Sequence, residues 1–215
     1  MMSKDLQLYQ VKLDIAEIEV DRLWQFLSAD ERSRADRFKR EYLKRNFVAA
    51  RGNLRIILAQ KLGCQPNEIQ FSYSDRGKPY IEGTYFNLAH SQDLAIYAVC
   101  GDREVGIDLE YINFECEVDR IAQRYFLPSE QKTIKDLGDR NKHEQYLAFY
   151  RAWTLKEAYG KATGKGIANG LDIVDVASLL EMPSSTLQIG EWTLKLISSE
   201  LEIDRSYAAA LCIAS

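Results

Sequence analysis

Two long helical segments, one in each half of the chain, constrain the fold more than any other feature of the sequence. Between residues 41 and 62 the apolar residues recur three or four positions apart, which predicts a long amphipathic helix that ends at Gly63. A second helix is predicted from about Asn141 to Ala162, closing at Gly164. Each half of the chain therefore contributes one long helix to the fold.

Strand patterns accompany both helices. In the first half they are LQLYQVKLDI, two short stretches around a turn at Gly77 and Pro79, and YFNLAHS followed by LAIYAVC. In the second half they are EVGIDLEYI, LDIVDV, WTLKLISS and SYAAALCIA. Shorter helices are predicted after Ser28, whose spacing to Glu31 is that of a capping box, over EVDRIAQRYF, and from Pro128. These elements predict an α+β fold of two similar lobes with pseudo-two-fold symmetry, 1–104 and 105–215, each a small antiparallel sheet packed with a long helix.

The composition is ordinary for a soluble globular protein, with 46% apolar and 28% charged residues. No apolar run approaches the roughly 20 residues of a membrane-spanning helix, and the first residues lack the apolar core of a secretory signal. The four cysteines lie far apart without a CxxC pair, and the two histidines are too few to favour a zinc site. We therefore expect a reduced, cytoplasmic protein with no membrane partner.

The charge is unevenly distributed along the chain. The net charge is −4, yet the segment from Ser28 to Arg55 holds nine basic residues against four acidic ones. A local basic segment on an acidic protein favours a small anionic ligand or an acidic partner over bulk nucleic acid. The alternative is a solvated helix face with no binding function.

The segment VGIDLE places two carboxylates on one predicted strand. Asp108 and Glu110 are two residues apart, and the period of a strand points both to the same face. Two carboxylates side by side repel each other and are stabilised by a cation between them. The alternative is a strand end that carries two solvated acids.

The segment WTLKEAYGK places another carboxylate and a lysine on one face of the second long helix. Glu157 and Lys161 are four residues apart, a spacing that also fits a plain surface ion pair. Trp153 and other aromatic residues surround Glu157 in the sequence, so we expect this carboxylate to be partly desolvated. Convergence of Asp108, Glu110 and Glu157 would form the hard oxygen-rich site that suits Mg²⁺.

Further groups could contact phosphate. His90 and Ser91 lie at a predicted strand end, where either could donate a hydrogen bond to a phosphate; His90 could equally be structural. Lys78 projects beside the predicted turn; the alternative is a plain hairpin with no binding function. The segment GKATGKGI follows a helix and lacks the Walker spacing, so it is not interpreted as a P-loop.

The set of motifs resembles the 4′-phosphopantetheinyl transferase superfamily. GIDLE and WTLKEAYGK resemble its two signature motifs, and GKPY, FNLAHS and ARGNLR resemble additional motifs of its larger, two-lobed (Sfp-type) branch. The resemblance runs in motif order from about residue 28 to 170. It implies Mg²⁺-dependent transfer of the phosphopantetheine arm of coenzyme A to a serine of an acyl or peptidyl carrier protein, with release of adenosine 3′,5′-bisphosphate.

The resemblance also implies roles for individual residues. Asp108, Glu110 and Glu157 match metal ligands, and Lys161 matches a lysine that neutralises the pyrophosphate. Glu157 is also the candidate general base, directly or through a metal-bound water. The coenzyme A contacts are expected from Arg34, Arg51, Lys78, His90 and Ser91. A phosphate-binding position of the family falls on Glu31, next to Arg34, and the helices after Glu115 match the surface that receives the carrier protein.

Two other classes of function compete with this interpretation. An Mg²⁺-dependent phosphodiester hydrolase could use the same three carboxylates, but GKPY and FNLAHS would then have no explanation. A non-catalytic nucleotide- or carrier-binding module could use the basic helix, but it would not need the three acids. The resemblance further implies a monomer with its active site between the two lobes, and no nucleic-acid partner.

Overall fold

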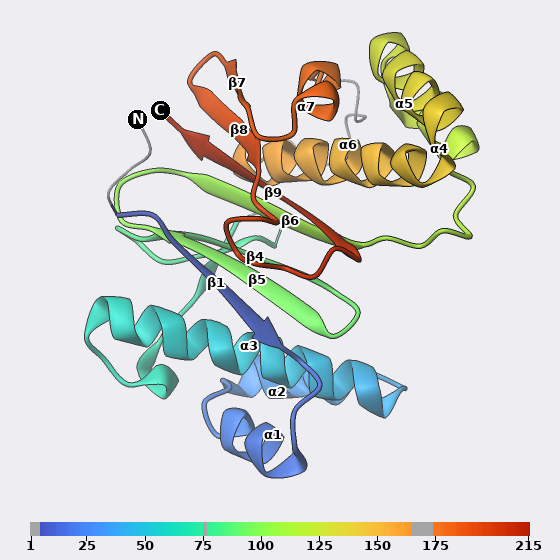
Figure 1. The fold of residues 1–215 in the computed structure, drawn as a ribbon. Coiled ribbons are helices and arrows are strands. Elements are labelled where there is room, and N and C mark those ends of the chain that lie inside the picture. The colour runs from blue at the N-terminus through green and yellow to red at the C-terminus, as the bar shows by residue number, and fades with distance from the viewer. Residues whose placement is uncertain (1–4, 75–76, 165–173) are drawn as a thin grey trace.

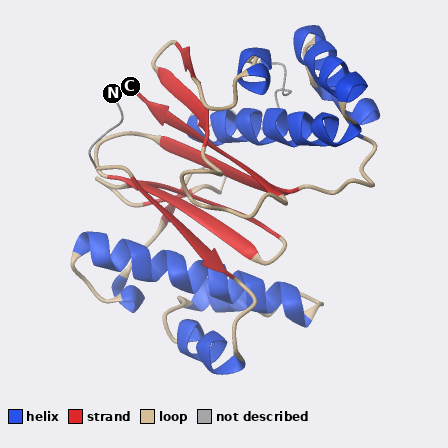
Figure 2. Ribbon diagram, viewed as in Figure 1, coloured by secondary structure: helices blue, strands red, loops and turns tan. Residues whose placement is uncertain are grey.

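The chain forms four layers, helices on the outside and two antiparallel sheets in the middle (Figures 1 and 2). This is a computed structural model, and it describes residues 5–74, 77–164 and 174–215. The predicted α+β class and the two-lobed arrangement are confirmed, because each sheet has its own long helix on one face.

The first lobe is built on a three-stranded sheet of order β1-β5-β4. Its long helix, α3, begins and ends where the apolar pattern predicted, and Gly63 caps it in the left-handed conformation at φ 69°. The capping box of Ser28 and Glu31 also forms. The elements of this lobe are β1 (Gln7–Lys12), α1 (Glu17–Trp24), α2 (Ala29–Ala35), α3 (Glu41–Leu62), η1 (Pro66–Glu68), β4 (Tyr85–Ser91) and β5 (Leu94–Cys100), with the separate hairpin β2 (Ser72–Tyr73) and β3 (Pro79–Tyr80).

The second lobe is built on a four-stranded sheet of order β6-β9-β8-β7. Helix α6 covers one face of this sheet, and α4, α5 and α7 pack around α6 (Figure 1). Its elements are β6 (Val105–Tyr111), α4 (Val118–Tyr125), α5 (Pro128–Arg140), α6 (Lys142–Ala162), α7 (Ala177–Glu181), β7 (Thr186–Ile189), β8 (Trp192–Leu196) and β9 (Tyr207–Ala214).

A shared hydrophobic core joins the two lobes. Each long helix covers a core of its own, and a further core lies between the two sheets. Strand β6 contributes Val105, Ile107 and Leu109 to this central core. Because side chains alternate along a strand, the residues between them point to the opposite face, toward α6. The central core thus fixes which face of β6 meets the signature helix.

Some predicted elements differ from the structure. Helices α1 and α7 and strand β7 were not predicted. The segment LDIVDV was predicted to be a strand, but residues 174–176 form none, and 171–173 lie outside the described residues. Val174 and Val176 are instead buried beside α5 and α6, where their backbone groups bind side chains of those helices. The β-branched residues of this segment are therefore explained by burial and not by pairing in a sheet.

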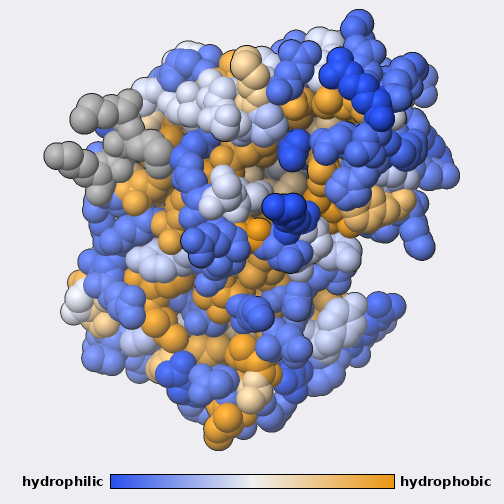
Figure 3. Space-filling model, in the orientation of Figure 1, coloured by the Kyte–Doolittle hydropathy of each residue, from blue (hydrophilic) through white to orange (hydrophobic). Residues whose placement is uncertain are grey.

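Hydrophilic groups cover most of the face seen in Figure 3, with scattered apolar patches between them. Across the described ranges of the chain, no helix combines the length and apolarity needed to cross a bilayer.

Candidate active site

Strand β6 and helix α6 pack with their backbones almost in contact. A Cβ atom on Gly106 would lie 2.2 Å from the carbonyl oxygen of Ala158, so only glycine fits this position. The same face of β6 carries Asp108 and Glu110, and α6 carries Glu157 and Lys161. The close approach at Gly106 therefore brings the two signature motifs together.

Lys161 joins these two elements. Its Nζ donates to Asp108 Oδ1 at 2.6 Å and to the carbonyl oxygen of Ile107 at 3.3 Å. Glu157 and Lys161 share a helix face, but the ion pair that the structure describes for Lys161 is with Asp108 across the β6–α6 interface. Lys161 therefore pairs with the carboxylate of strand β6 rather than with Glu157 on its own helix.

The carboxylates are strongly desolvated. Asp108 is 5% exposed and Glu157 is 9% exposed, as the aromatic surroundings of Glu157 predicted. Burial, followed by the Asp108 charge, raises the pKa of Glu157 to about 7, although Lys161 acts in the opposite direction. Burial and then the Asp108 charge also raise the pKa of Glu110. The three acids therefore repel one another and favour a cation or a proton between them.

The residues present fit a divalent cation by their chemistry. Two buried oxygens, Asp108 Oδ2 and Glu157 Oε1, have no hydrogen-bond partner in the structure. Within the described ranges, no group of three or more Asp, Glu, His or Cys residues forms a ready-made metal site. Mg²⁺ normally takes one or two carboxylates and completes its shell with waters and substrate phosphate, so a preformed cage is not required. The donor set therefore suits Mg²⁺ with a phosphate-bearing substrate.

The end of β4 contacts this acidic site from the first lobe. The Ser91 hydroxyl donates to Glu110 Oε2 at 3.3 Å and accepts from the Tyr111 backbone N–H at 3.0 Å. The Trp153 indole N–H also donates to Glu110, which offsets part of the burial-driven rise in the pKa of that carboxyl. His90 is exposed at the surface, and partial desolvation followed by the Lys161 charge lowers its pKa. Ser91 therefore lies beside Glu110, and His90 lies near enough to Lys161 to be affected by its charge; the contact of either residue with coenzyme A stays a prediction.

A small cationic pocket lies in the first lobe, near the C-terminal end of the signature helix. It has a volume of about 240 Å³, and the basic residues that line it are Arg34, Arg51 and Lys78. None of its described lining residues is acidic, and Leu54, Phe86 and Leu88 give it apolar walls. Lys78 Nζ donates to the carbonyl oxygen of Lys161 at 2.8 Å, which places the pocket next to the acidic site. We call this the cationic pocket.

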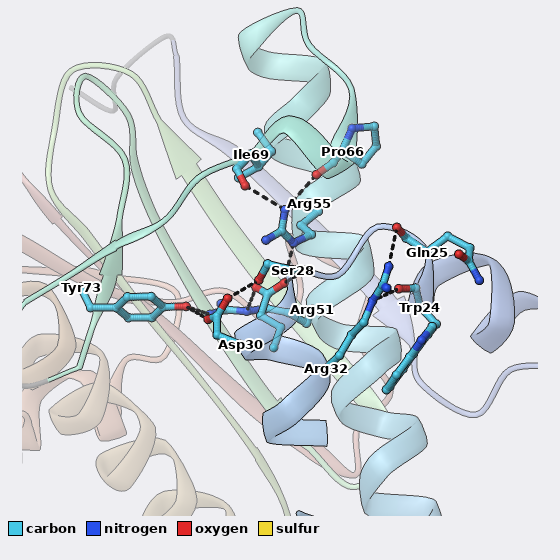
Figure 4. A network of polar contacts seen from close by, with 11 residues as sticks. Trp24, Gln25, Ser28, Asp30, Arg32, Arg51, Arg55, Pro66, Ile69 and Tyr73 are labelled. Atoms are coloured by element: carbon cyan, nitrogen blue, oxygen red, sulfur yellow. Dashed lines mark hydrogen bonds and ion pairs between the residues drawn. The ribbon is translucent and has the colours of Figure 1, made fainter. Parts of the chain in front are cut away.

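Glu31, which the resemblance aligned with a phosphate-binding position, has a different environment. It is 2% exposed and is held between Arg51 Nε at 2.7 Å and Arg55 Nε at 2.6 Å. Figure 4 shows the two arginines. A buried carboxylate paired with two arginines cannot bind a phosphate. The sequence signal for this network was the spacing of Arg51 and Arg55, one helical turn apart on the apolar side of α3, and our reading of the sequence missed it.

The fold and the site define a two-lobed protein in which a cluster of buried carboxylates lies beside a pocket lined by arginine and lysine. Comparison with known proteins specifies this class. Residues 104–212 match the 4′-phosphopantetheinyl transferase superfamily. The 4′-phosphopantetheinyl transferase HetI of a Nostoc species is 39% identical over 100% of this chain and 90% of its own length. The transferase psf-1 of Bacillus pumilus is 31% identical over 90% of this chain and 82% of its own. Sfp of Bacillus subtilis is 27% identical over 97% and 92%.

The chain belongs to the 4′-phosphopantetheinyl transferase superfamily, and it is a transferase of this kind. The hydrolase alternative receives no support, because these relatives are all named as transferases. The recognition of the family from its motifs is thereby confirmed.

Proposed function

We propose that this enzyme uses Mg²⁺ to transfer the 4′-phosphopantetheine group of coenzyme A to a serine of an acyl or peptidyl carrier protein. The product would be the holo carrier protein, and the released product adenosine 3′,5′-bisphosphate. The observation that carries the proposal is the placement of Asp108, Glu110, Glu157 and Lys161 at one β6–α6 contact, with two carboxylate oxygens unpartnered.

Coenzyme A carries two anionic groups, a pyrophosphate and a 3′-phosphate on its ribose. Lys161 and a cation held by Asp108, Glu110 and Glu157 suit the pyrophosphate, where the reaction takes place. The cationic pocket suits the 3′-phosphate and its nucleoside, since it combines Arg34, Arg51 and Lys78 with apolar walls. The contact of Lys78 with the backbone of Lys161 supports placing both groups of one ligand across these two sites.

At phosphorus the reaction forms one bond and breaks one. The serine oxygen bonds to the β-phosphorus, the bond from that phosphorus to the bridging oxygen breaks, and the bisphosphate leaves with the electron pair. A bound Mg²⁺ would withdraw negative charge from the pyrophosphate. Lys161 reinforces this by placing its ammonium charge beside the leaving group. Glu157 is the candidate acceptor of the serine proton, directly or through a water.

The carrier protein is expected on the second lobe, beside the acidic site. The segment that leaves β6 exposes Phe114, which stacks on His143 and contacts Tyr146. Helix α4 follows in the chain. An exposed aromatic group next to a reactive site is a suitable anchor for a protein substrate. Both lobes belong to one chain, so we expect a cytoplasmic monomer to be sufficient.

A mass-spectrometric assay tests the proposal. An apo carrier protein is incubated with the enzyme, coenzyme A and Mg²⁺, in parallel with Glu157→Gln and with EDTA. The expected result is a carrier protein heavier by one phosphopantetheinyl group, and this gain should disappear with the variant or the chelator. Coenzyme A consumption without a carrier product would instead support the hydrolase. Absence of coenzyme A binding would contradict the proposal.

A further inference from the structure

A buried ionic network lies directly behind the cationic pocket. Glu31 on α2 forms ion pairs with Arg51 and Arg55 on α3, and all three side chains are at most 8% exposed. Arg55 also donates to the carbonyl oxygens of Pro66 and Ile69 at 3.0 and 2.9 Å. Figure 4 shows the Glu31 partners at the centre of this network. The two arginines share one carboxylate, but only Arg51 lines the cationic pocket.

The network fixes the guanidinium of Arg51 from three sides. Its Nε faces Glu31, its Nη2 donates to the Tyr73 hydroxyl at 3.2 Å, and its plane lies over the Phe71 ring at 4.7 Å. Tyr73 in turn donates to Asp30 Oδ2 at 3.4 Å, on the helix that carries Glu31. These contacts tie α2, α3 and the β2–β3 hairpin together, and the same three segments supply the basic residues of the pocket.

Resting on the proposed function above, we propose that Glu31 is a positioning residue for coenzyme A: it holds Arg51 in the orientation that the 3′-phosphate requires. Glu31 is too deeply buried to touch the ligand itself. A free arginine side chain would lose rotamer entropy on binding phosphate, and Glu31 removes that cost beforehand. The carboxylate also supplies the charge that keeps two adjacent arginines buried together.

The test measures the KM for coenzyme A, and for 3′-dephospho-coenzyme A, of the wild-type enzyme, Glu31→Gln and Glu31→Asp. In Glu31→Gln we expect the KM for coenzyme A to rise about tenfold with kcat within about twofold of wild type, the loss of one oriented charged contact. With 3′-dephospho-coenzyme A, the variant and the wild type should have the same KM. Glu31→Asp keeps the charge but retracts it by one methylene. Its KM for coenzyme A should therefore lie between those of the wild type and Glu31→Gln.

Arg55→Lys is the matched control, because Arg55 shares the carboxylate but does not line the pocket. It should lower the melting temperature without changing either KM. The double variant Glu31→Gln/Arg51→Lys should have the same KM as Arg51→Lys alone, since Glu31 acts through Arg51. If Glu31→Gln does not fold, Glu31→Asp and its double variant with Arg51→Lys provide the same comparison.

Several outcomes would overturn the proposal. A folded Glu31→Gln enzyme with an unchanged KM, or with the same rise for both substrates, would show that Glu31 is only structural. Additive effects in the double variant would show that Glu31 does not act through Arg51. If the wild-type enzyme has the same KM for both substrates, the 3′-phosphate does not bind in the cationic pocket, although the proposed transferase activity is unaffected. A wild-type enzyme that modifies no carrier protein would instead contradict the proposed function.

Discussion

The Lys161 ammonium lies 2.6 Å from Asp108 Oδ1, across the contact between helix α6 and strand β6. In the absence of substrate this lysine compensates part of the negative charge of three neighbouring acids. We propose that coenzyme A brings its pyrophosphate to a cation held by these acids, so that Lys161 then faces phosphate. The ion pair thus keeps the lysine where the reaction needs it.

Replacing Lys161 by Met should lower kcat/KM by at least about 100-fold, because a charge aimed at the leaving group contributes several kcal/mol in the transition state. The measurement is the initial rate of carrier-protein modification. Lys61→Met is the control: it removes another partly buried ion pair, with Asp5, away from the site. Equal losses in both variants would contradict a specific role for Lys161.

Mg²⁺ should stabilise the protein against unfolding. A ligand that binds only the folded state adds about 2.7 kcal/mol at a concentration of 100 times its Kd. Asp108→Asn and Glu157→Gln should abolish the Mg²⁺-dependent rise in melting temperature, because each removes one of the unpartnered oxygens. An Mg²⁺ effect that survives in both variants would place the cation elsewhere.

The stability of the metal-free protein should fall as the pH rises from about 4.5 to about 7. The folded pKa of Glu157 is raised from 4.5 to about 7, so the folded state binds more protons than the unfolded state across this interval. Below it the group is protonated in both states, and above it the full penalty of a buried charge is present. Urea unfolding in EDTA at several pH values measures the slope. Glu157→Gln should flatten the slope, and an unchanged slope would assign it to other groups.

The buried pair of Lys156 and Glu130 should be important for stability. Both side chains are 0% exposed and lie 2.8 Å apart, and Glu130 also accepts from the backbone of Val176. Lys156→Met should cost about 3–5 kcal/mol of unfolding free energy because it leaves a buried carboxylate without its cation. Lys132→Met, which breaks an exposed pair with Asp136, should leave the unfolding free energy almost unchanged. Similar costs in urea unfolding would refute this distinction.

Gly106→Ala should reduce both stability and activity. The new methyl group would lie 2.2 Å from the backbone of α6, and overpacking of this kind costs about 1–3 kcal/mol. Activity should fall as well, because the shift separates the strand of Asp108 from the helix of Glu157. Gly63→Ala is the control: its φ of 69° strains the new residue but nothing lies within 4 Å. Normal activity in a destabilised Gly106→Ala enzyme would show that the β6–α6 spacing is not critical.

The sequence by itself determined the local elements and the faces they present. The apolar period of 41–62 fixed α3 to the residue, and the alternation along 105–111 placed Asp108 and Glu110 on one face, since helix and strand periods depend only on neighbouring residues. Short elements such as α1, α7 and β7 carry too few periods to be recognised this way.

Only the tertiary structure decided which distant groups meet. Local patterns do not show that Lys161 pairs with Asp108, that Glu31 is buried between two arginines, or that Arg34, Arg51 and Lys78 share one pocket. Each of these contacts joins different elements, and packing of the helices on the sheets sets their distances. The acidic and basic residues of the site were therefore predictable from the sequence. Which of them pair depends on the close packing of α6 against β6 and of α2 against α3.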